Sequence, residues 1–400
     1  MRVSLYILTL IICFSCTNRN LKNHYFLSDN LNQGSLSINI IDSIMIKNNQ
    51  RGLKEFLPLG LSPSKEKLLL VDGRGKSNVY IVDLPSKAIQ YIDLNEYLDE
   101  RTNNEDLSFN NIGFVSDSIL SFFKSNKITL FDFKNQKLIS ERELPFGYFS
   151  SFNKKVEVIV TELDTIYIAN YHSKRKSKFY NESDGIYDTA VLSLYSSSNN
   201  SFNNIYLPNV SLFKDKNIGQ PIVNFVRDQE RIYFSVSPEN KIYTFKVDEL
   251  NFQVSGLNAY DFTYTFSDTL LSFEKSNFIK DIYKLSMLNP IQEDIVLSNN
   301  YLLLSVVKSL NEDEYMGLLE NYESEKKKLE NFTKKRKAYV EILDVEKNTH
   351  LGHYELDEST FSISLKLTDS TFLLKPKHTF FYFNEEVPLY IAKLEVNEKS

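Results

Sequence analysis

The chain has 400 residues, of which 42% are hydrophobic and 13% aromatic, and its formal net charge is −6 at pH 7. This apolar content is enough for a large folded core, and it excludes the low-hydrophobicity composition of disordered chains. The acidic balance argues against a nucleic-acid-binding protein, because such proteins need a basic surface to meet the phosphate backbone.

The N-terminal segment 1–15 predicts an export signal. Arg2 gives a basic tip, an apolar run covers 3–14, and Ser15 stands directly before Cys16. This order is typical of a secretory signal. The cysteine after the small residue resembles a bacterial lipoprotein signal, in which that cysteine is lipidated and becomes the mature N-terminus. The alternative is an uncleaved membrane anchor, but about 20 apolar residues are needed to span a bilayer.

The sequence around Cys16 also indicates where the mature protein resides. No acidic residue directly follows this cysteine, which favours an outer-membrane lipoprotein that faces the periplasm over the cell surface. The chain's other cysteine, Cys13, lies within the expected signal. The mature protein is therefore expected to have no disulfide, no cysteine nucleophile and no thiolate metal site. Residues 16–35 are expected to form a tether between the lipid and the folded domain.

From residue 36 onward the sequence reads as short strands separated by polar turns. One unit recurs, in which an apolar strand ends in aspartate and is followed by a turn and a second strand; its clearest copies end at Asp83, Asp132, Asp248 and Asp344. These aspartates are 49, 116 and 96 residues apart, which is loosely one, two and two multiples of a common period. A period of about 40–50 residues with four strands per unit predicts a β-propeller.

We therefore expect an all-β fold, a β-propeller of four-stranded blades that covers 36–400. Spacing favours seven units, at about 57–97, 108–145, 150–207, 219–257, 260–298, 299–356 and 359–396. Six blades are the alternative if 260–298 is an irregular extension. The last unit lacks a fourth strand, and the apolar run 38–46 is expected to supply it and to close the ring. Within the units, Asp117, Asp228 and Asp369 are expected to form turns between the first two strands.

The segment 311–337 breaks the β pattern. It is rich in Glu and Lys, and its apolar residues have helical spacing. Asn311 followed by Glu314 predicts a helix N-terminus, and the basic residues 334–337 suit a helix C-terminus. We expect one long helix or a helical hairpin inserted in the sixth unit. It is interpreted either as a solvated helix that covers the propeller edge or as an arm that docks a partner.

No motif for a catalytic site is present. The chain lacks the zinc-hydrolase, nucleophile-elbow and phosphate-loop patterns. His350 and His353 are three residues apart in an expected strand, which would place them on opposite faces and make a shared metal site unfavourable. Each is expected to be a surface or turn residue. The repeated aspartates are interpreted as turn formers rather than as a functional carboxylate ring. We expect neither a metal nor a cofactor.

The connection after residue 171 is strongly basic on this acidic chain. It contains the candidate contact residues Lys174, Arg175, Lys176, Lys178 and Tyr180. Such a loop could contact an anionic ligand, an acidic glycan or lipid headgroups. The alternative interpretation is a solvated charged loop.

With Ser15-Cys16 and the repeated strand–Asp–turn–strand units, the chain resembles the uncharacterised β-propeller lipoproteins of Gram-negative bacteria. These are families of unknown function with a six- or seven-bladed fold similar to the propeller of the periplasmic TolB protein. The resemblance transfers no catalytic residue. The first functional hypothesis is a membrane-anchored, non-enzymatic binding or scaffold module whose propeller face takes a protein, peptide or glycan. The alternative is a propeller enzyme, a glycan lyase or hydrolase with an axial active site.

Overall fold

The computed structural model describes twenty stretches of the chain. They are residues 23–25, 27–28, 36–47, 56–72, 78–97, 110–124, 127–144, 148–149, 156–169, 171–172, 190–206, 222–228, 231–237, 239–248, 253–261, 291–308, 310–321, 337–356, 362–375 and 386–396.

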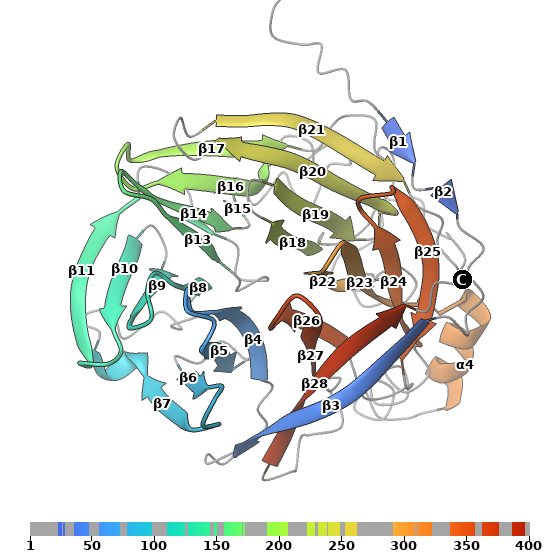
Figure 1. Cartoon of the computed structure of the whole chain (residues 1–400), viewed down its shortest axis with the longest axis horizontal. Helices are drawn as coiled ribbons and strands as arrows, with labels where there is room; N and C mark the ends of the chain where they lie inside the picture. The colour runs from blue at the N-terminus through green and yellow to red at the C-terminus, as the bar shows by residue number, and fades with distance from the viewer. Residues whose placement is uncertain are drawn as a thin grey trace, which may run out of the picture.

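The described residues form six antiparallel sheets of four strands each, arranged around a central axis (Figure 1). We call these sheets blades 1–6 in the order of their innermost strands. Blade 1 contains β4 (Phe56–Leu61), β5 (Lys67–Asp72), β6 (Asn78–Asp83) and β7 (Ile89–Asp93). Blade 2 contains β8 (Asn110–Phe114), β9 (Ile119–Lys124), β10 (Lys127–Asp132) and β11 (Lys137–Glu143). Blade 3 contains β13 (Glu157–Val160), β14 (Thr165–Ala169), β16 (Ala190–Ser196) and β17 (Ser201–Tyr206).

The second half of the ring has the same plan. Blade 4 contains β18 (Ile222–Asp228), β19 (Arg231–Ser237), β20 (Lys241–Asp248) and β21 (Gln253–Asp261). Blade 5 contains β22 (Ile291–Ser298), β23 (Tyr301–Val307), β24 (Ala338–Asp344) and β25 (Thr349–Glu355). Blade 6 contains β26 (Ser362–Lys366), β27 (Thr371–Lys375), β28 (Glu386–Val396) and β3 (Leu36–Lys47). The fold is therefore an all-β six-bladed propeller.

The core lies between the blades rather than within any one of them. Each of the six seams between neighbouring blades holds its own cluster of buried apolar side chains. A single four-stranded sheet cannot bury both of its faces, so each blade depends on its two neighbours.

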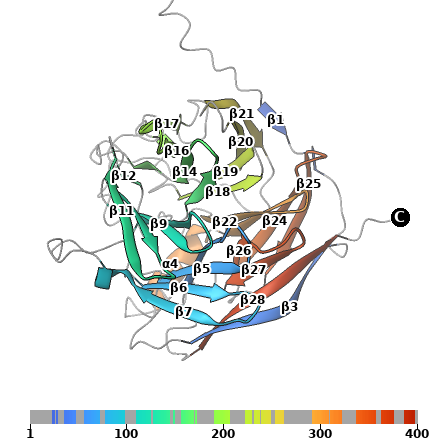
Figure 2. The same ribbon diagram turned by 60° about the vertical axis from the view of Figure 1, so that its left-hand side comes forward.

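The ring is closed by a strand from the N-terminal part of the chain. β3 pairs antiparallel with β28 along its whole length, from Leu36 opposite Val396 to Lys47 opposite Glu386 (Figure 2). Ile44 and Ile46 of β3 are buried in the cluster between blades 6 and 1. The predicted closing strand is confirmed. Because strands from both ends of the chain share one sheet, the ring cannot open without losing this pairing.

The preference for seven blades is wrong, and the six-bladed alternative is correct. Of the expected unit 260–298, the structure describes the end of β21 in blade 4 and the first strand of blade 5, β22. The spacing along the sequence counts the connection between two blades as well as the strands, so a long connection imitates an extra unit.

The turns between the third and fourth strands, which we call the outer hairpins, share one local solution. In blade 2 the Asp132 carboxylate accepts hydrogen bonds from the backbone N–H groups of Lys134 and Asn135, at 3.0 and 2.9 Å. Asp83 and Asp344 accept equivalent bonds in blades 1 and 5. In each of these three turns the fourth residue after the aspartate has a positive φ, and the turn of blade 3 also contains a residue with positive φ. These residues are Lys87, Gln136, Asn348 and, in blade 3, Asn200. The interpretation of these aspartates as turn formers is confirmed for blades 1, 2 and 5, and the turn after Asp248 lies outside the described residues.

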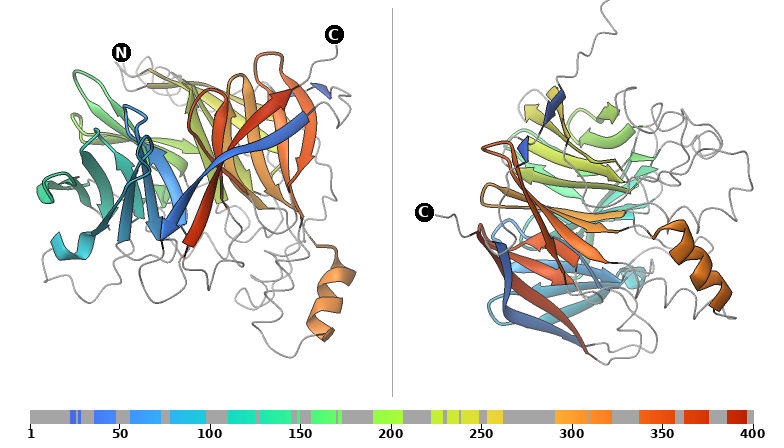
Figure 3. Two further views of the ribbon diagram at one scale, coloured as in Figure 1. Left: turned by 60° about the horizontal axis from the view of Figure 1, so that its bottom comes forward. Right: turned by 90° about the vertical axis from the view of Figure 1, so that its right-hand side faces the viewer.

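The predicted helix insertion is present in its first part. Helix α4 (Glu312–Asn321) follows β23 and extends beyond the strand ends of the ring (Figure 3). The predicted helix start at Asn311 is confirmed, and it forms a capping box: the Asn311 side chain accepts from the N–H of Glu314 at 2.8 Å, and Glu314 accepts from the N–H of Asn311 at 3.0 Å. The rest of the predicted insertion, up to residue 336, lies outside the described residues. Among the described residues, no helix combines the length and the apolar character needed to cross a membrane.

Several short elements lie outside the regular blade plan. β1 (Asn23–Tyr25) pairs parallel with the outer strand of blade 4, and β2 (Leu27–Ser28) pairs parallel with the outer strand of blade 5. Part of the segment expected to tether the lipid is thus paired with the propeller. β12 (Tyr148–Phe149) and β15 (Tyr171–His172) form a two-stranded sheet, and a 3-10 helix covers Leu94–Tyr97.

The expected placement of the two histidines of β25 is wrong. A bulge in β25 aligns His350 with Leu343 and His353 with Glu341 of β24, so both histidines share one face of the sheet. His350 is buried, and its Nε2 lies 2.8 Å from a carboxylate oxygen of the fully buried Glu341. Gly352, at φ 123°, occupies the bulge. The alternation of faces fails here because a bulge inserts one residue into the pattern.

Candidate functional site

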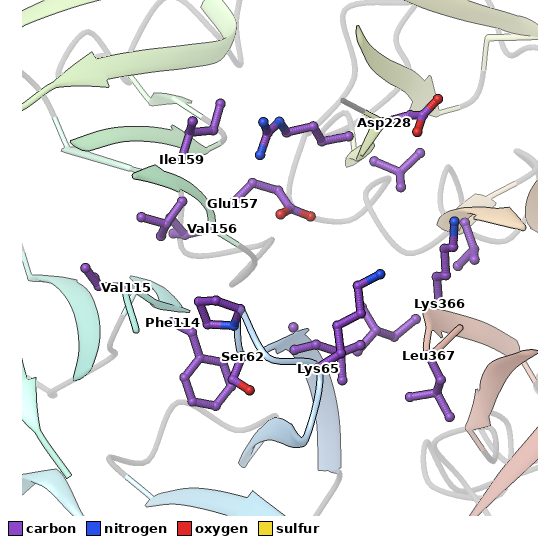
Figure 4. A pocket seen from close by; sticks show the side chains of 18 of the residues that line it. Ser62, Lys65, Phe114, Val115, Val156, Glu157, Ile159, Asp228, Lys366 and Leu367 are labelled. Atoms are coloured by element: carbon purple, nitrogen blue, oxygen red, sulfur yellow. The ribbon is translucent and has the colours of Figure 1, made fainter. Parts of the chain in front are cut away.

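The candidate site is a pocket on the propeller axis with a volume of about 810 Å³ (Figure 4). All six innermost strands, β4, β8, β13, β18, β22 and β26, contribute to its wall. The turns at the ends of these strands in blades 1, 2 and 6 contribute to its rim. The pocket is therefore a product of the whole ring.

The turns between the first and second strands, which we call the inner hairpins, are held by hydroxyl groups. In blade 2, Ser116 Oγ accepts from the N–H groups of Ser118 and Ile119 at 3.3 and 3.1 Å. Thr161 in blade 3 and Thr368 in blade 6 make the equivalent pairs of bonds. The hydroxyl thus closes the turn in these three hairpins without using a charged side chain.

One side of the pocket, formed by the adjacent blades 6 and 1, is cationic. Lys65 lies on the inner hairpin of blade 1, and Lys366 ends the innermost strand of blade 6. Figure 4 shows the Lys65 side chain directed toward the middle of the pocket and the Lys366 side chain along its edge. Lys366 Nζ also lies 2.9 Å from Asp369 Oδ1 at the rim. This side therefore carries two cations and one carboxylate.

The opposite side, formed by the adjacent blades 3 and 4, carries the acids Glu157 and Asp228. Glu157 starts the innermost strand of blade 3, is partly buried, and points into the pocket in Figure 4. Asp228 ends the innermost strand of blade 4, directly after Arg227, which also lines the pocket. Blades 3 and 4 lie across a six-bladed ring from blades 6 and 1, so the two acids lie across the axis from the two lysines.

Apolar walls separate the two charged sides. Phe114 and Val115 of blade 2 form one wall, and Ile295 and Val296 of blade 5 form the other. On blade 3 the lip of the pocket is also apolar, because Val160 is 57% exposed. The pocket thus combines apolar walls with seven charged residues, which makes it more polar than the usual small-ligand site.

Two rim carboxyls have lowered pKa values. The pKa of Asp117 is below its ordinary value because the backbone N–H of Ser64 on the neighbouring blade donates to it at 3.0 Å. The pKa of Asp369 is lowered by the hydrogen bond from Lys366. Hydrogen bonds and cations that favour the charged form lower a carboxyl pKa. Both groups are therefore carboxylates at neutral pH.

Among the described residues, no group of three or more His, Cys, Asp or Glu side chains could hold a metal ion. The buried pair of Glu341 and His350 lies within blade 5 and does not line the pocket. Its role is structural, because the two groups satisfy each other's hydrogen bonding in the core.

The site residues that the sequence suggested are not tested by the structure. Cys16 and the basic set Lys174, Arg175, Lys176, Lys178 and Tyr180 lie outside the described residues. Sequence reasoning identified Asp117, Asp228 and Asp369 as turn residues, and the structure places all three at the pocket. It missed Lys65, Glu157 and Lys366. Lys65 lies in a hairpin, Glu157 starts a first strand and Lys366 ends one, so these residues share no position in the repeat that the sequence could have shown.

Comparison with known proteins supports the fold. A member of the DUF4221 family from Bacteroides vulgatus is similar to this chain with a TM-score of 0.61 at 9% identity, over 91% of this chain and 100% of that one. Regucalcin, a calcium-binding protein from Agrobacterium tumefaciens, gives a TM-score of 0.45 at 12% identity, over 90% and 96%. No protein-family profile matches the chain, and no curated protein matches it significantly. At these identities the likeness extends to the fold alone.

Proposed function

We propose that this protein is a lipid-anchored module of the cell envelope that binds its ligand, without catalysis, in the axial pocket. The observation that carries the proposal is the pocket itself, to which all six innermost strands contribute. A site built this way is rigid, because each wall is fixed by the packing of two seams. Preformed pockets with placed polar groups are typical of binding sites.

The composition of the pocket favours binding over catalysis. Among the described residues that line it there is no histidine, cysteine or tyrosine, which are frequent acid–base and nucleophilic groups. The lowered pKa values of Asp117 and Asp369 make these two carboxyls poor proton donors at neutral pH.

The proposed anchor is Cys16, and the proposed location is the periplasmic face of the outer membrane. The support is the sequence order of Arg2, the apolar run, Ser15 and Cys16. We expect the wild-type protein to incorporate a labelled fatty acid and to fractionate with the outer membrane. The Cys16→Ser variant is expected to lose the label. Label retained in that variant would refute lipidation at this residue.

Glycine substitutions test binding at the pocket. Gly60 lines the pocket, and an added Cβ there would meet no atom within 4 Å. Gly60→Trp should therefore fill the pocket without straining the backbone. Gly317 on α4 has the same open space and provides a matched tryptophan control.

Partners of both variants would be captured from crosslinked cells with the full, anchored chain and identified by mass spectrometry. The proposal expects a partner of the wild type to be lost with Gly60→Trp and kept with Gly317→Trp. Loss with Gly317→Trp alone would instead assign the docking role to the helix. Partners unaffected by Gly60→Trp would refute the pocket as the binding site.

A second candidate function is hydrolysis or lysis of a glycan, and one observation favours testing it. Glu157 and Asp228 come from neighbouring blades and both line the pocket, and a pair of carboxyl groups is the usual equipment of glycosidases. Turnover of an envelope polysaccharide by purified protein, lost in Glu157→Gln and Asp228→Asn, would establish this function. Turnover that both variants retain would exclude the pair.

A further inference from the structure

The charged groups of the axial pocket are distributed unevenly, and their distribution indicates the class of ligand. Lys65 and Lys366 belong to blades 1 and 6, whereas Glu157 and Asp228 belong to blades 3 and 4. Blade 6 also contributes Asp369, blade 4 contributes Arg227 and blade 2 contributes Asp117. The excess charge is therefore positive at blades 6 and 1 and negative at blades 3 and 4, where Figure 4 labels the two lysines and the two acids. The pocket has a positive side and a negative side with apolar walls between them.

A ligand that matches this arrangement carries one anionic and one cationic group at its two ends. Carboxylates form their strongest hydrogen bonds with lysine or arginine, and ammonium groups form theirs with carboxylates. A charge that leaves water without such a partner is strongly disfavoured. A ligand with one charge only would satisfy one side of the pocket and leave the other side unmatched.

Other ligand classes fit less well. A phosphorylated ligand needs an excess of cations, but the pocket lining has the three cations Lys65, Arg227 and Lys366 against four carboxylates. Sugar rings stack their C–H faces on exposed aromatic rings. Among the described residues of the lining the one aromatic side chain is that of Phe114, and it is only 6% exposed. An apolar chain fits the walls but not the charged sides.

We infer that the axial pocket binds a short peptide with free termini, whose carboxylate contacts Lys65 and Lys366 and whose ammonium group contacts Glu157 and Asp228. The apolar side chains of the peptide contact the walls formed by blades 2 and 5. The volume of about 810 Å³ lies within the range of small-ligand sites, roughly 300–1,000 Å³. This inference rests on the proposed function and specifies its ligand.

The test measures binding of trileucine to the full chain, purified in detergent, by calorimetry. Four forms of the peptide are compared: free, N-acetylated, C-amidated and modified at both ends. The free form is expected to bind, and each modification is expected to weaken binding by roughly tenfold to a hundredfold, because it removes a charge-assisted contact.

Two double variants assign each terminus to its side of the pocket. Lys65→Ala with Lys366→Ala should abolish the effect of amidation and keep the effect of acetylation. Glu157→Gln with Asp228→Asn should abolish the effect of acetylation and keep the effect of amidation. For each variant, the affinity for a modified peptide is compared with the affinity of the same variant for the free peptide. A variant that binds all peptides more weakly therefore does not give a false loss of either modification effect.

Matched controls use surface ion pairs outside the pocket. Lys127 pairs with Glu141, and Lys337 pairs with Glu355. Lys127→Ala with Lys337→Ala, and Glu141→Gln with Glu355→Gln, change the net charge by the same amounts as the pocket variants. Both controls are expected to bind the four peptides as the wild type does.

Equal binding of all four peptides, or no binding of any up to millimolar concentration, would overturn the inference. Modification effects that the pocket variants leave intact would overturn it as well, because the peptide would then bind elsewhere. The capture experiment with Gly60→Trp is independent of these peptides. A partner lost in that variant, together with no peptide binding, would keep the proposed function and reject the peptide as its ligand.

Discussion

The described outer and inner hairpins of the propeller differ in how much they vary from blade to blade. In the outer hairpins of blades 1, 2 and 5 an aspartate accepts from the backbone of the turn, and a residue with positive φ follows. The inner hairpins of blades 2, 3 and 6 share a hydroxyl group that closes the turn, as at Ser116 and Thr368, while their charged residues change from blade to blade. The uniform hairpins belong to the scaffold, and the varied ones surround the pocket.

This comparison teaches that stability and binding should separate by position. Substitutions in the seams and outer hairpins are expected to change stability and to leave peptide affinity unchanged. Substitutions at the inner hairpins are expected to change peptide affinity and to leave stability unchanged.

The closing strand should give the largest loss of stability. Ile46 is fully buried in the seam between blades 6 and 1, whereas Ile41 on the same strand is 56% exposed. Ile46→Ala should lower the free energy of unfolding by about 3–4 kcal/mol, because it removes buried methyl groups and leaves a cavity. Ile41→Ala should stay within about 0.5 kcal/mol of wild type. Urea unfolding measures both, and equal losses would show that the seam does not control stability.

The buried pair of blade 5 should come next. His350→Ala removes the partner 2.8 Å from the Glu341 carboxylate, and we expect a loss of about 2–3 kcal/mol, because a buried carboxylate loses a hydrogen bond. His353→Ala, on the same face but less buried, is the control and should cost less. Peptide affinity should remain unchanged in both. A loss from His353→Ala as large as that from His350→Ala would contradict the structural role assigned to the pair.

Gly113 tests the boundary between scaffold and pocket. A Cβ at this position would lie 2.7 Å from the backbone oxygen of Val156, which lines the pocket on the next blade. Gly113→Ala should cost about 1–2 kcal/mol, because backbone atoms must shift, and it should also weaken peptide binding. Gly60→Ala meets no atom within 4 Å and serves as the control in urea unfolding. Unchanged stability of Gly113→Ala would mean that the two blades separate easily.

An outer hairpin should show a small effect that depends on pH. The pKa of Asp132 is lowered from its ordinary value of 3.8, chiefly by the hydrogen bond from the backbone N–H of Asn135. A lowered folded-state pKa contributes stability above the unfolded-state pKa, and this contribution is lost as pH falls through the folded-state pKa. The advantage of wild type over Asp132→Asn in urea midpoint should therefore shrink below pH 3.8. An advantage that is constant with pH would contradict this.

The matched inner aspartate should affect binding instead. Asp369 competes for Lys366 at the positive side of the pocket. Asp369→Asn should strengthen binding of free trileucine by at most about fivefold, because an exposed ion pair is worth little. The affinity of the amidated peptide should stay the same. Tighter binding of both peptides would show that Asp369 acts on something other than the peptide carboxylate.

The sequence by itself determined the features that depend on neighbouring residues. The strand–Asp–turn units follow from side-chain alternation and from the ability of aspartate to cap its own turn, as at Asp83 and Asp344. The start of α4 follows from Asn311 and Glu314, three residues apart. The closing role of the run 38–46 followed from a count of strands in the last unit.

Only the tertiary structure decided the features that depend on pairing between distant segments. The number of blades is set by which strands pair, and the sequence spacing near 260–298 gave no sign that β22 pairs only with later strands. The burial of His350 depends on a bulge, which reverses the alternation of faces. The pocket brings together residues that are far apart in the sequence, because six blades share one axis. Among them are Lys65, Glu157 and Lys366. Local physics therefore fixed the hairpins, and closure of the ring created the pocket.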